Sequence, residues 1–189
     1  MLFLRIKCDT IKYQKTEDTM GIEIFKSRRS IKSYKKEQIK KEELDLILEA
    51  GTYAPTGMNR QSPLIVAFTD EKTVREMASE NAKIMGREGI DPFYGAPTVV
   101  VVFVDSEVNT GMEDACLVLG NMLNAAHAIG VGSCWIHRAR EVFETPYGIA
   151  LKKKLGIPEK YYAVGNCILG YPEIIPDVRP RKDGYIIRV

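Results

Sequence analysis

The segment from Thr98 to Val104, TVVVVFV, constrains the fold more than any other part of the sequence. Its consecutive residues are mostly β-branched or aromatic, and such side chains favour strands. A strand with one face in water alternates apolar and polar residues, whereas this segment is apolar on both faces. We therefore expect a central strand that is covered on both sides, which predicts a layered sandwich.

Three further segments have the length and composition of core strands. They are LIVAF at 64–68, SCWIH at 133–137 and YYAVGNCILG at 161–170. The residues alone do not determine the directions of these strands. Because the chain shows no internal repeat, low-complexity tract or linker, we expect one domain over residues 20–189.

Apolar residues spaced three and four apart predict helices around these strands. The predicted helices carry Ile22 and Phe25; Leu44, Ile47, Leu48 and Gly51; Val74, Met77 and Ala78; and a segment from after His137 to Leu155. The second of them should end before Pro55. The last segment, 171–189, contains three prolines and is expected to form an extended arm.

The segment from Met112 to Ile129 is apolar or small at almost every position. A helix that is apolar all round must be buried on all sides. In a chain of 189 residues, we expect a second subunit to supply part of that cover. Glu113 and Asp114 stand where the N-terminus of a helix favours negative charge.

The first 19 residues are polar and aperiodic, and the periodic chain begins at Met20. We expect either a loose extension or a translation start at Met20, which the intact mass of the native protein would distinguish. The chain has no signal peptide pattern and no apolar run of the ~20 residues that a membrane span needs. These features predict a soluble cytoplasmic protein that does not enter membranes.

Charge and cysteine usage exclude several classes of protein. Lys and Arg number 27 against 25 Asp and Glu, so the formal net charge of +2 does not indicate nucleic-acid binding. The four cysteines, Cys8, Cys116, Cys134 and Cys167, lie far apart without a C-x-x-C pair. They predict reduced thiols, with neither a disulfide framework nor a metal site.

Common catalytic motifs are missing or incomplete. GVGSCW lacks the third glycine of a dinucleotide loop and follows a helix, and neither a phosphate loop nor G-x-S-x-G occurs. Cys134 and His137 would point to opposite faces of a strand, which makes them a poor nucleophile and base pair. His127 lies among alanines and is expected to be a core or interface residue.

The segment KSRRSIKSY, from Lys26 to Tyr34, concentrates cations and hydroxyls. It has two interpretations. Arg28 and Arg29 could favour the negative end of a helix dipole at the protein surface. Alternatively, guanidinium groups and the hydroxyl of Ser30 could bind a phosphomonoester through bidentate hydrogen bonds.

A second polar segment, APTGMNRQSP at 54–63, joins a helix to a strand. Its residues are ordinary in turns. However, the side-chain amides of Asn59 and Gln61 pair a donor with an acceptor, and this combination suits the edge of a heterocycle such as a flavin pyrimidine ring.

These motifs together resemble the FMN-dependent nitroreductases. RRSIKSY, LEAGTYAPTGMNRQSP, GAPTVVVV, NAAHAIGVGSCWI, LGIPEKYYAVGNCILGYP and RPRKDG follow one another as in that family, across residues 20–189. The resemblance implies a three-layer α/β/α sandwich of the α+β class, with a mainly antiparallel sheet. It also implies a homodimer with two FMN sites at the interface and a C-terminal arm that wraps the partner.

The resemblance assigns site residues by motif. The FMN phosphate would be held by Arg28, Arg29, Ser30, Arg181 and Lys182, and Lys32 would lie near the flavin N1 and C2 edge. The loop that reaches the flavin of the partner would carry Pro55, Thr56, Gly57 and Asn59. Trp135, Ile136 and His137 would form the strand end beside the ring, where a backbone N–H could reach N5. Asn81 would be a ring contact.

The implied activity is ping-pong hydride transfer through flavin N5, from NADH or NADPH to a nitroaromatic, quinone or similar electron-poor acceptor. Because the cofactor carries the reaction, no side chain is assigned as a general acid or base. A flavin-binding protein for storage or sensing remains an alternative. A third hypothesis, nucleic-acid binding through residues 26–40, predicts salt-sensitive retention on DNA.

Overall fold

The computed structural model describes residues 20–189. The expected loose extension, residues 1–19, lies outside the described residues. No helix within residues 20–189 has the length and apolar character needed to cross a membrane.

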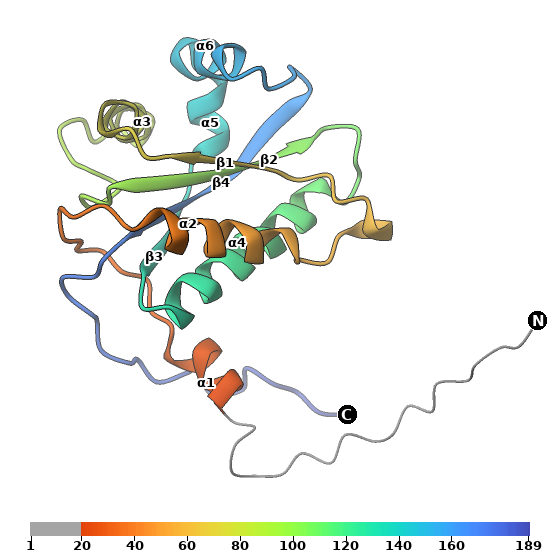
Figure 1. Ribbon diagram of the computed structural model, residues 1–189. Helices are drawn as coiled ribbons and strands as arrows, with labels where there is room; N and C mark the ends of the chain where they lie inside the picture. The colour runs from red at the N-terminus through yellow and green to blue at the C-terminus, as the bar shows by residue number, and fades with distance from the viewer. Residues whose placement is uncertain (1–19) are drawn as a thin grey trace, which may run out of the picture.

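Four strands form one antiparallel sheet in the order β1-β2-β4-β3 (Figure 1). They are β1 (Leu64–Phe68), β2 (Thr98–Asp105), β3 (Gly132–Ile136) and β4 (Tyr161–Gly170). Each strand that the sequence predicts is present, and the antiparallel sheet is confirmed. The predicted third strand ends one residue early, before His137.

Strand β2 separates two hydrophobic cores. Every second residue packs on one face of the sheet, and the residues between them pack on the other. The first set is Val99, Val101 and Phe103, and the second is Val100, Val102 and Val104. Because all six side chains are fully buried, the prediction of a central strand covered on both faces is confirmed.

Helices cover both faces of this sheet (Figure 1). One core is closed by α2 (Lys41–Thr52) and α4 (Gly111–Ala128), and the other by α3 (Glu71–Ile84), α5 (Ala139–Glu144) and α6 (Pro146–Lys154). The remaining helix, α1 (Met20–Ser27), contacts α4 outside these layers. The predicted three-layer sandwich is therefore confirmed.

The prediction of a single helix up to Leu155 is wrong, because the helix is interrupted at Thr145, between α5 and α6. Thr145 has an extended backbone (φ −73°, ψ 161°), and its hydroxyl accepts a hydrogen bond from the Gly148 amide at 3.2 Å. Pro146 follows at the first helical position, where its missing N–H costs nothing. A threonine cap before a proline thus starts a new helix.

Helix α4 is only partly covered within this chain. Its inward face includes Val118, Leu119 and Met122, all buried, whereas Met112 and Leu117 on its other side are 40% and 47% exposed. The exposed apolar side is where the sequence predicts cover from a second subunit.

The C-terminal segment forms no helix and is exposed from Glu173 onward, as expected for an extended arm. Its start is fixed beside the chain that follows α1. The Lys35 amide donates to the Tyr171 carbonyl at 2.9 Å, and the Glu173 amide donates to the Ser33 carbonyl at 3.0 Å. Beyond these contacts, the arm runs on the same side of the sheet as α1 (Figure 1).

Candidate functional site

The chain after α1 adds a short parallel pairing to the edge of the sheet. Ser30 forms an isolated bridge with Ser133 of β3, and the Ile31 amide donates to the Ser133 carbonyl at 3.0 Å. Gly132 makes this approach possible, because a Cβ there would lie 3.0 Å from Cγ1 of Ile31. The pairing brings the basic segment at 28–32 next to the end of β3.

A cleft of about 500 Å³ opens where these segments meet, within the size range of small-molecule sites. Its walls come from the chain after α1, the loop after α3 and the end of β3. The lining residues are Ser30, Lys32, Met85, Arg87, Ile90, Asp91, Pro92, Tyr94, Cys134, Trp135, Ile136, His137 and Arg138. Five residues of the predicted site therefore converge here: Ser30, Lys32, Trp135, Ile136 and His137.

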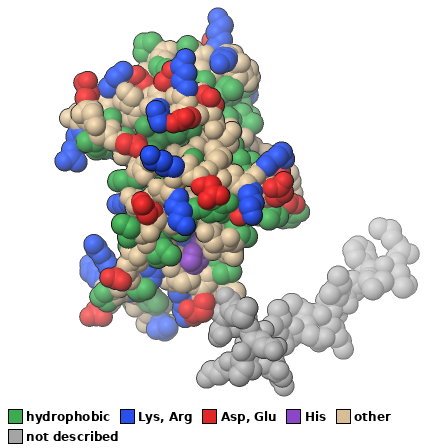
Figure 2. Space-filling model, turned by 60° about the vertical axis from the view of Figure 1, so that its left-hand side comes forward, with side chains coloured by type: hydrophobic (Ala, Val, Ile, Leu, Met, Phe, Trp, Pro, Cys, Tyr) green, Lys and Arg blue, Asp and Glu red, His purple; other side chains and the backbone are tan. Residues whose placement is uncertain are grey.

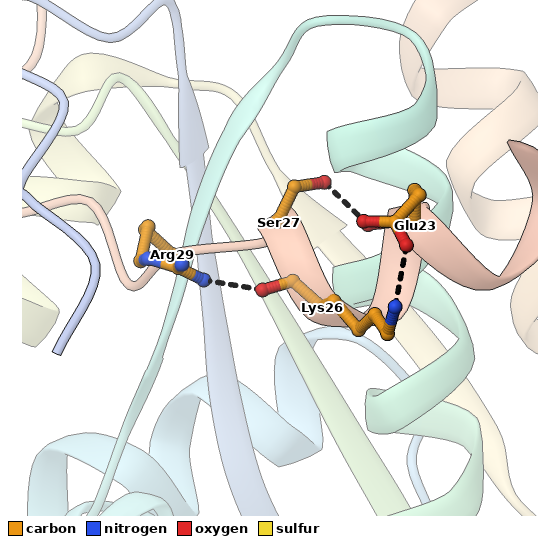
Figure 3. Close-up of polar contacts among 4 residues, drawn as sticks. All are labelled: Glu23, Lys26, Ser27 and Arg29. Carbon is orange, nitrogen blue, oxygen red and sulfur yellow. Dashed lines mark hydrogen bonds and ion pairs between the residues drawn. The ribbon is translucent and has the colours of Figure 1, made fainter. Parts of the chain in front are cut away.

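Arg28 and Arg29 immediately precede this cleft, and each carries a buried nitrogen without a partner. Nη1 of Arg28 and Nε of Arg29 have no hydrogen bond within the described part of the chain. Nη1 of Arg29 donates to the Lys26 carbonyl at 2.7 Å (Figure 3). It also donates to the Arg28 carbonyl at 2.7 Å. Arg29 thus supplies a donor to a carbonyl in the last turn of α1, as the helix-end interpretation predicts. The buried guanidinium atoms are nevertheless left for another acceptor.

His127 on α4 lies next to this basic pair. Its Nε2 is 2.7 Å from the Ser27 hydroxyl. That hydroxyl donates to the Glu23 carbonyl at 2.5 Å (Figure 3). Since the only hydroxyl proton is already used, Nε2 must carry the hydrogen and donate. Burial, followed by the charges of Arg28 and Arg29, lowers the pKa of His127 below its ordinary value.

Tyr94 shapes the mouth of the cleft beside Lys32. The Lys32 ammonium lies 5.7 Å from the centre of the Tyr94 ring, within the range of cation–π attraction. Tyr94 has a left-handed backbone (φ 54°), and Asp91 fixes its loop by accepting from the Phe93 and Gly95 amides. Sequence reasoning missed this residue; the turn-forming stretch DPFYG was the available signal.

The end of β3 presents different groups to different sides. The Trp135 ring packs toward the α2 and α4 core, where a Cβ on Gly165 would lie 2.6 Å from it. Cys134 faces the opposite core, and burial raises the pKa of its thiol. That thiol donates to the Trp135 carbonyl at 3.5 Å, with no bond to His137 among the described residues, as expected for a poor pair.

Asn81 lies behind the cleft and is completely buried. Its Nδ2 donates to the His137 carbonyl at 2.8 Å, and it is absent from the residues that line the cleft. The site prediction placed Asn81 against the ring, whereas its amide contacts the backbone next to the cleft.

The loop containing Pro55, Thr56, Gly57 and Asn59 does not line this cleft. It includes the short helix η1 (Gly57–Asn59) and is attached to α4 by a bond from the Gly57 amide to Asp114 Oδ1 at 2.9 Å. The Gln61 side-chain amide donates to Asn59 Oδ1 at 3.2 Å. The two amides that the sequence offers to a heterocycle therefore contact each other in the single chain.

Arg181 and Lys182 lie on the exposed C-terminal arm. They do not line the cleft, and neither takes part in a side-chain hydrogen bond or ion pair recorded for residues 20–189. The single chain therefore brings neither residue to Arg28 and Arg29.

A larger hollow of about 970 Å³ lies between α3 and the loop after it, and shares Ile90 and Asp91 with the cleft. Charged side chains along it are exposed and form local ion pairs, such as Lys83 with Glu80 at 2.6 Å. On the face drawn in Figure 2, acidic and basic side chains are interspersed without a continuous basic area. The smaller cleft is the better candidate because Ser30 in its lining directly follows Arg28 and Arg29, each of which has a buried nitrogen without a partner in residues 20–189.

Comparison with known proteins identifies close structural counterparts. A nitroreductase with bound FMN from Bacteroides fragilis has a TM-score of 0.83 at 28% identity, over 93% of this chain and 100% of that chain. A protein of Archaeoglobus fulgidus, provisionally named an NADH dehydrogenase/NAD(P)H nitroreductase, is 28% identical over 87% of this chain and 92% of its own length. The FMN reductase (NAD(P)H) of Bacillus subtilis is 26% identical over 84% of this chain and 70% of its own.

The model of the Nitroreductase family matches residues 25–171. The match extends from the end of α1 to just past β4, so it includes the four strands, the basic segment and the lining of the cleft. The chain belongs to the nitroreductase family.

Proposed function

We propose that this protein is an FMN-dependent oxidoreductase that takes electrons from NADH or NADPH and reduces electron-poor acceptors, with nitroaromatics and quinones as test substrates. Family membership and the FMN named for the Bacteroides fragilis structure support the cofactor. The names of the curated relatives support a nicotinamide donor.

One observation carries the assignment of the cleft: the unpartnered nitrogens of Arg28 and Arg29. A phosphate group offers strong acceptors to guanidinium donors and removes the cost of leaving them unpaired. Ser30 adds a hydroxyl next to them at the edge of the cleft. These residues fit the phosphate of FMN.

The flavin ring would occupy the part of the cleft lined by Lys32, Trp135 and Ile136. Lys32 would place its ammonium near the N1 and C2 edge, where a cation stabilises negative charge. The backbone after Trp135 and Ile136 would present an N–H toward N5. Bound FMN would supply hydride transfer, while the chain binds and orients it.

A homodimer would complete the site. The exposed apolar residues of α4 support an interface, as do Phe25 at 64% exposed and Ile187 of the arm at 85%. We propose that the loop with Pro55, Thr56, Gly57 and Asn59 reaches the flavin of the partner. Arg181 and Lys182 of the exchanged arm would then join the phosphate.

The absorbance spectrum of the purified protein tests the proposal. A yellow protein, or a colourless one that binds added FMN, is expected. Anaerobic addition of NADPH or NADH should bleach the flavin within seconds, because enzymes typically turn over about 1 to 1000 times per second. A bound flavin that neither nucleotide bleaches would instead indicate a storage or sensing protein. Failure to bind FMN would contradict both functions.

A further inference from the structure

Two buried asparagines hold the carbonyl oxygen of His137. Asn81 on α3 donates Nδ2 to it at 2.8 Å, and Asn166 on β4 donates Nδ2 to it at 3.4 Å. Asn166 also donates to the Ile136 carbonyl at 3.1 Å. The two side chains are 0% and 1% exposed, so water does not compete for these bonds. The His137 carbonyl thus has a donor for each of its lone pairs.

Both asparagines lie where an apolar residue would suit the local fold better. Asn166 interrupts the buried face of β4, and asparagine is depleted in strands. Oδ1 of Asn81 is buried without a partner in residues 20–189, which costs free energy. Residues that break a local rule in this way indicate a requirement beyond folding.

The bonds to the carbonyl also fix the direction of the next amide. No peptide bond in the described chain is cis, and in a trans peptide the C=O and N–H point in opposite directions. The carbonyl of His137 faces the two asparagines, so the N–H of Arg138 points away from them. Arg138 lines the cleft with a left-handed backbone (φ 72°). Its N–H has no backbone acceptor within the described residues.

We propose that Asn81 and Asn166 are positioning residues that aim the Arg138 N–H at N5 of the flavin. The inference rests on the proposed FMN function and deepens it. Two bonds fix the plane of one peptide, so the donor is oriented before the cofactor binds and little ordering is needed on binding. Neither asparagine contacts the flavin; both act through the peptide that they hold.

The test compares Asn81→Asp and Asn166→Asp with a matched control, Asn121→Asp. Asn121 donates its Nδ2 to the Ala50 carbonyl at 3.2 Å, which is the same type of bond away from the cleft. The measured quantities are the Kd for oxidised FMN and the midpoint potential of the bound flavin. Circular dichroism establishes that each variant is folded.

We expect the Kd for oxidised FMN to rise about three- to tenfold in Asn81→Asp and in Asn166→Asp, as for the loss of one hydrogen bond. In Asn166→Leu, which removes the donor without adding a charge, the midpoint potential should become more positive. Oxidised N5 has an in-plane lone pair that accepts the N–H, whereas reduced N5 carries a hydrogen, so a misplaced donor weakens binding of the oxidised form more. The Asn121→Asp control should show neither change.

A pH series adds a readout that general loss of structure would not give. The Asn166→Asp carboxyl can donate to the carbonyl only when protonated. Its FMN affinity, relative to wild type, should therefore recover as the pH falls. Asn166→Leu should show no recovery.

The outcomes separate the inference from the function on which it rests. If wild-type protein does not bind FMN, the proposed function fails and this inference fails with it. If wild type binds FMN but Asn81→Asp and Asn166→Asp keep its Kd and midpoint potential, the positioning role alone is overturned. If Asn166→Asp does not fold, Asn81→Asp decides, because it leaves the bonds of Asn166 in place.

Discussion

The carboxylate of Asp114 on α4 accepts a hydrogen bond from the Gly57 amide at 2.9 Å, across 57 residues of sequence. Its second oxygen accepts from the Thr110 hydroxyl at 3.1 Å, and the side chain is only 3% exposed. Asp114→Ala should lower the free energy of unfolding by about 1–3 kcal/mol, because it leaves the Gly57 amide unpaired. Chemical denaturation measures the change.

Glu113 is the matched control, since it is the exposed neighbour of Asp114 at the same helix end. Glu113→Ala should change stability by no more than about 0.5 kcal/mol. Equal losses in the two variants would mean that helix-dipole charge matters here, and that the bond to the loop does not.

Arg28→Ala should weaken FMN binding far more than Lys36→Ala. Removing a guanidinium that bonds to phosphate costs about 1.5–3 kcal/mol, which corresponds to roughly a 10- to 100-fold rise in Kd. Lys36 is exposed outside the cleft, and its removal should change Kd by less than about twofold. Fluorescence titration with FMN gives both constants. Equal effects of the two substitutions would favour the helix-end interpretation of the basic segment over phosphate binding.

His127 should make the stability of the FMN-free protein depend on pH. Burial and the two arginines lower its pKa in the folded state, so the unfolded chain binds more protons just below the ordinary value of 6.5. Stability should therefore rise with pH through this range and fall as the pH drops. The free energy of unfolding, measured with urea between about pH 5 and 7, should rise more steeply with pH for wild type than for His127→Gln. Parallel slopes would contradict the prediction.

Gly148→Ala should be strongly destabilising. A Cβ at this position would lie 2.2 Å from the Val142 carbonyl oxygen and 2.4 Å from the Phe143 Cα, both backbone atoms that cannot rotate away. The expected loss is about 3 kcal/mol, the upper end for overpacking, measured by thermal or chemical unfolding. Ala150→Gly, on the exposed side of α6, should cost no more than about 1 kcal/mol. Similar losses would show that α6 can move away from α5.

Much of the fold could be predicted from the sequence because the composition of the strands themselves indicates which of them are buried. From Val99 to Val104 the strand has no polar residue that could face water, so its sequence predicts a core on each face of the sheet. The break at Thr145 was missed because apolar spacing continues across it, and a capping threonine before proline is a weaker pattern than the periodicity around it.

The candidate site was predictable only where its chemistry is visible in single residues. Arg28 and Arg29 stand out by charge, and they directly precede Ser30, which lines the cleft. Their role in binding stays a prediction. Asn166 could not be found, because a polar residue within an apolar strand does not reveal its partner. The pairing of Ser30 with Ser133 was equally hidden, since one short parallel bridge leaves no periodic pattern.

That pairing also determines when a binding site can exist during synthesis. Ser30 emerges from the ribosome about a hundred residues before Ser133, so the basic segment is made long before the strand with which Ser30 pairs. β4 lies between β3 and the rest of the sheet, and it is made later still. A ligand of the cleft can therefore stabilise only a chain that has been made past β4, by mass action on the folded state. Nascent chains that stop before residue 170 should gain nothing from its presence, which makes the ligand a selective stabiliser of chains whose sheet is complete.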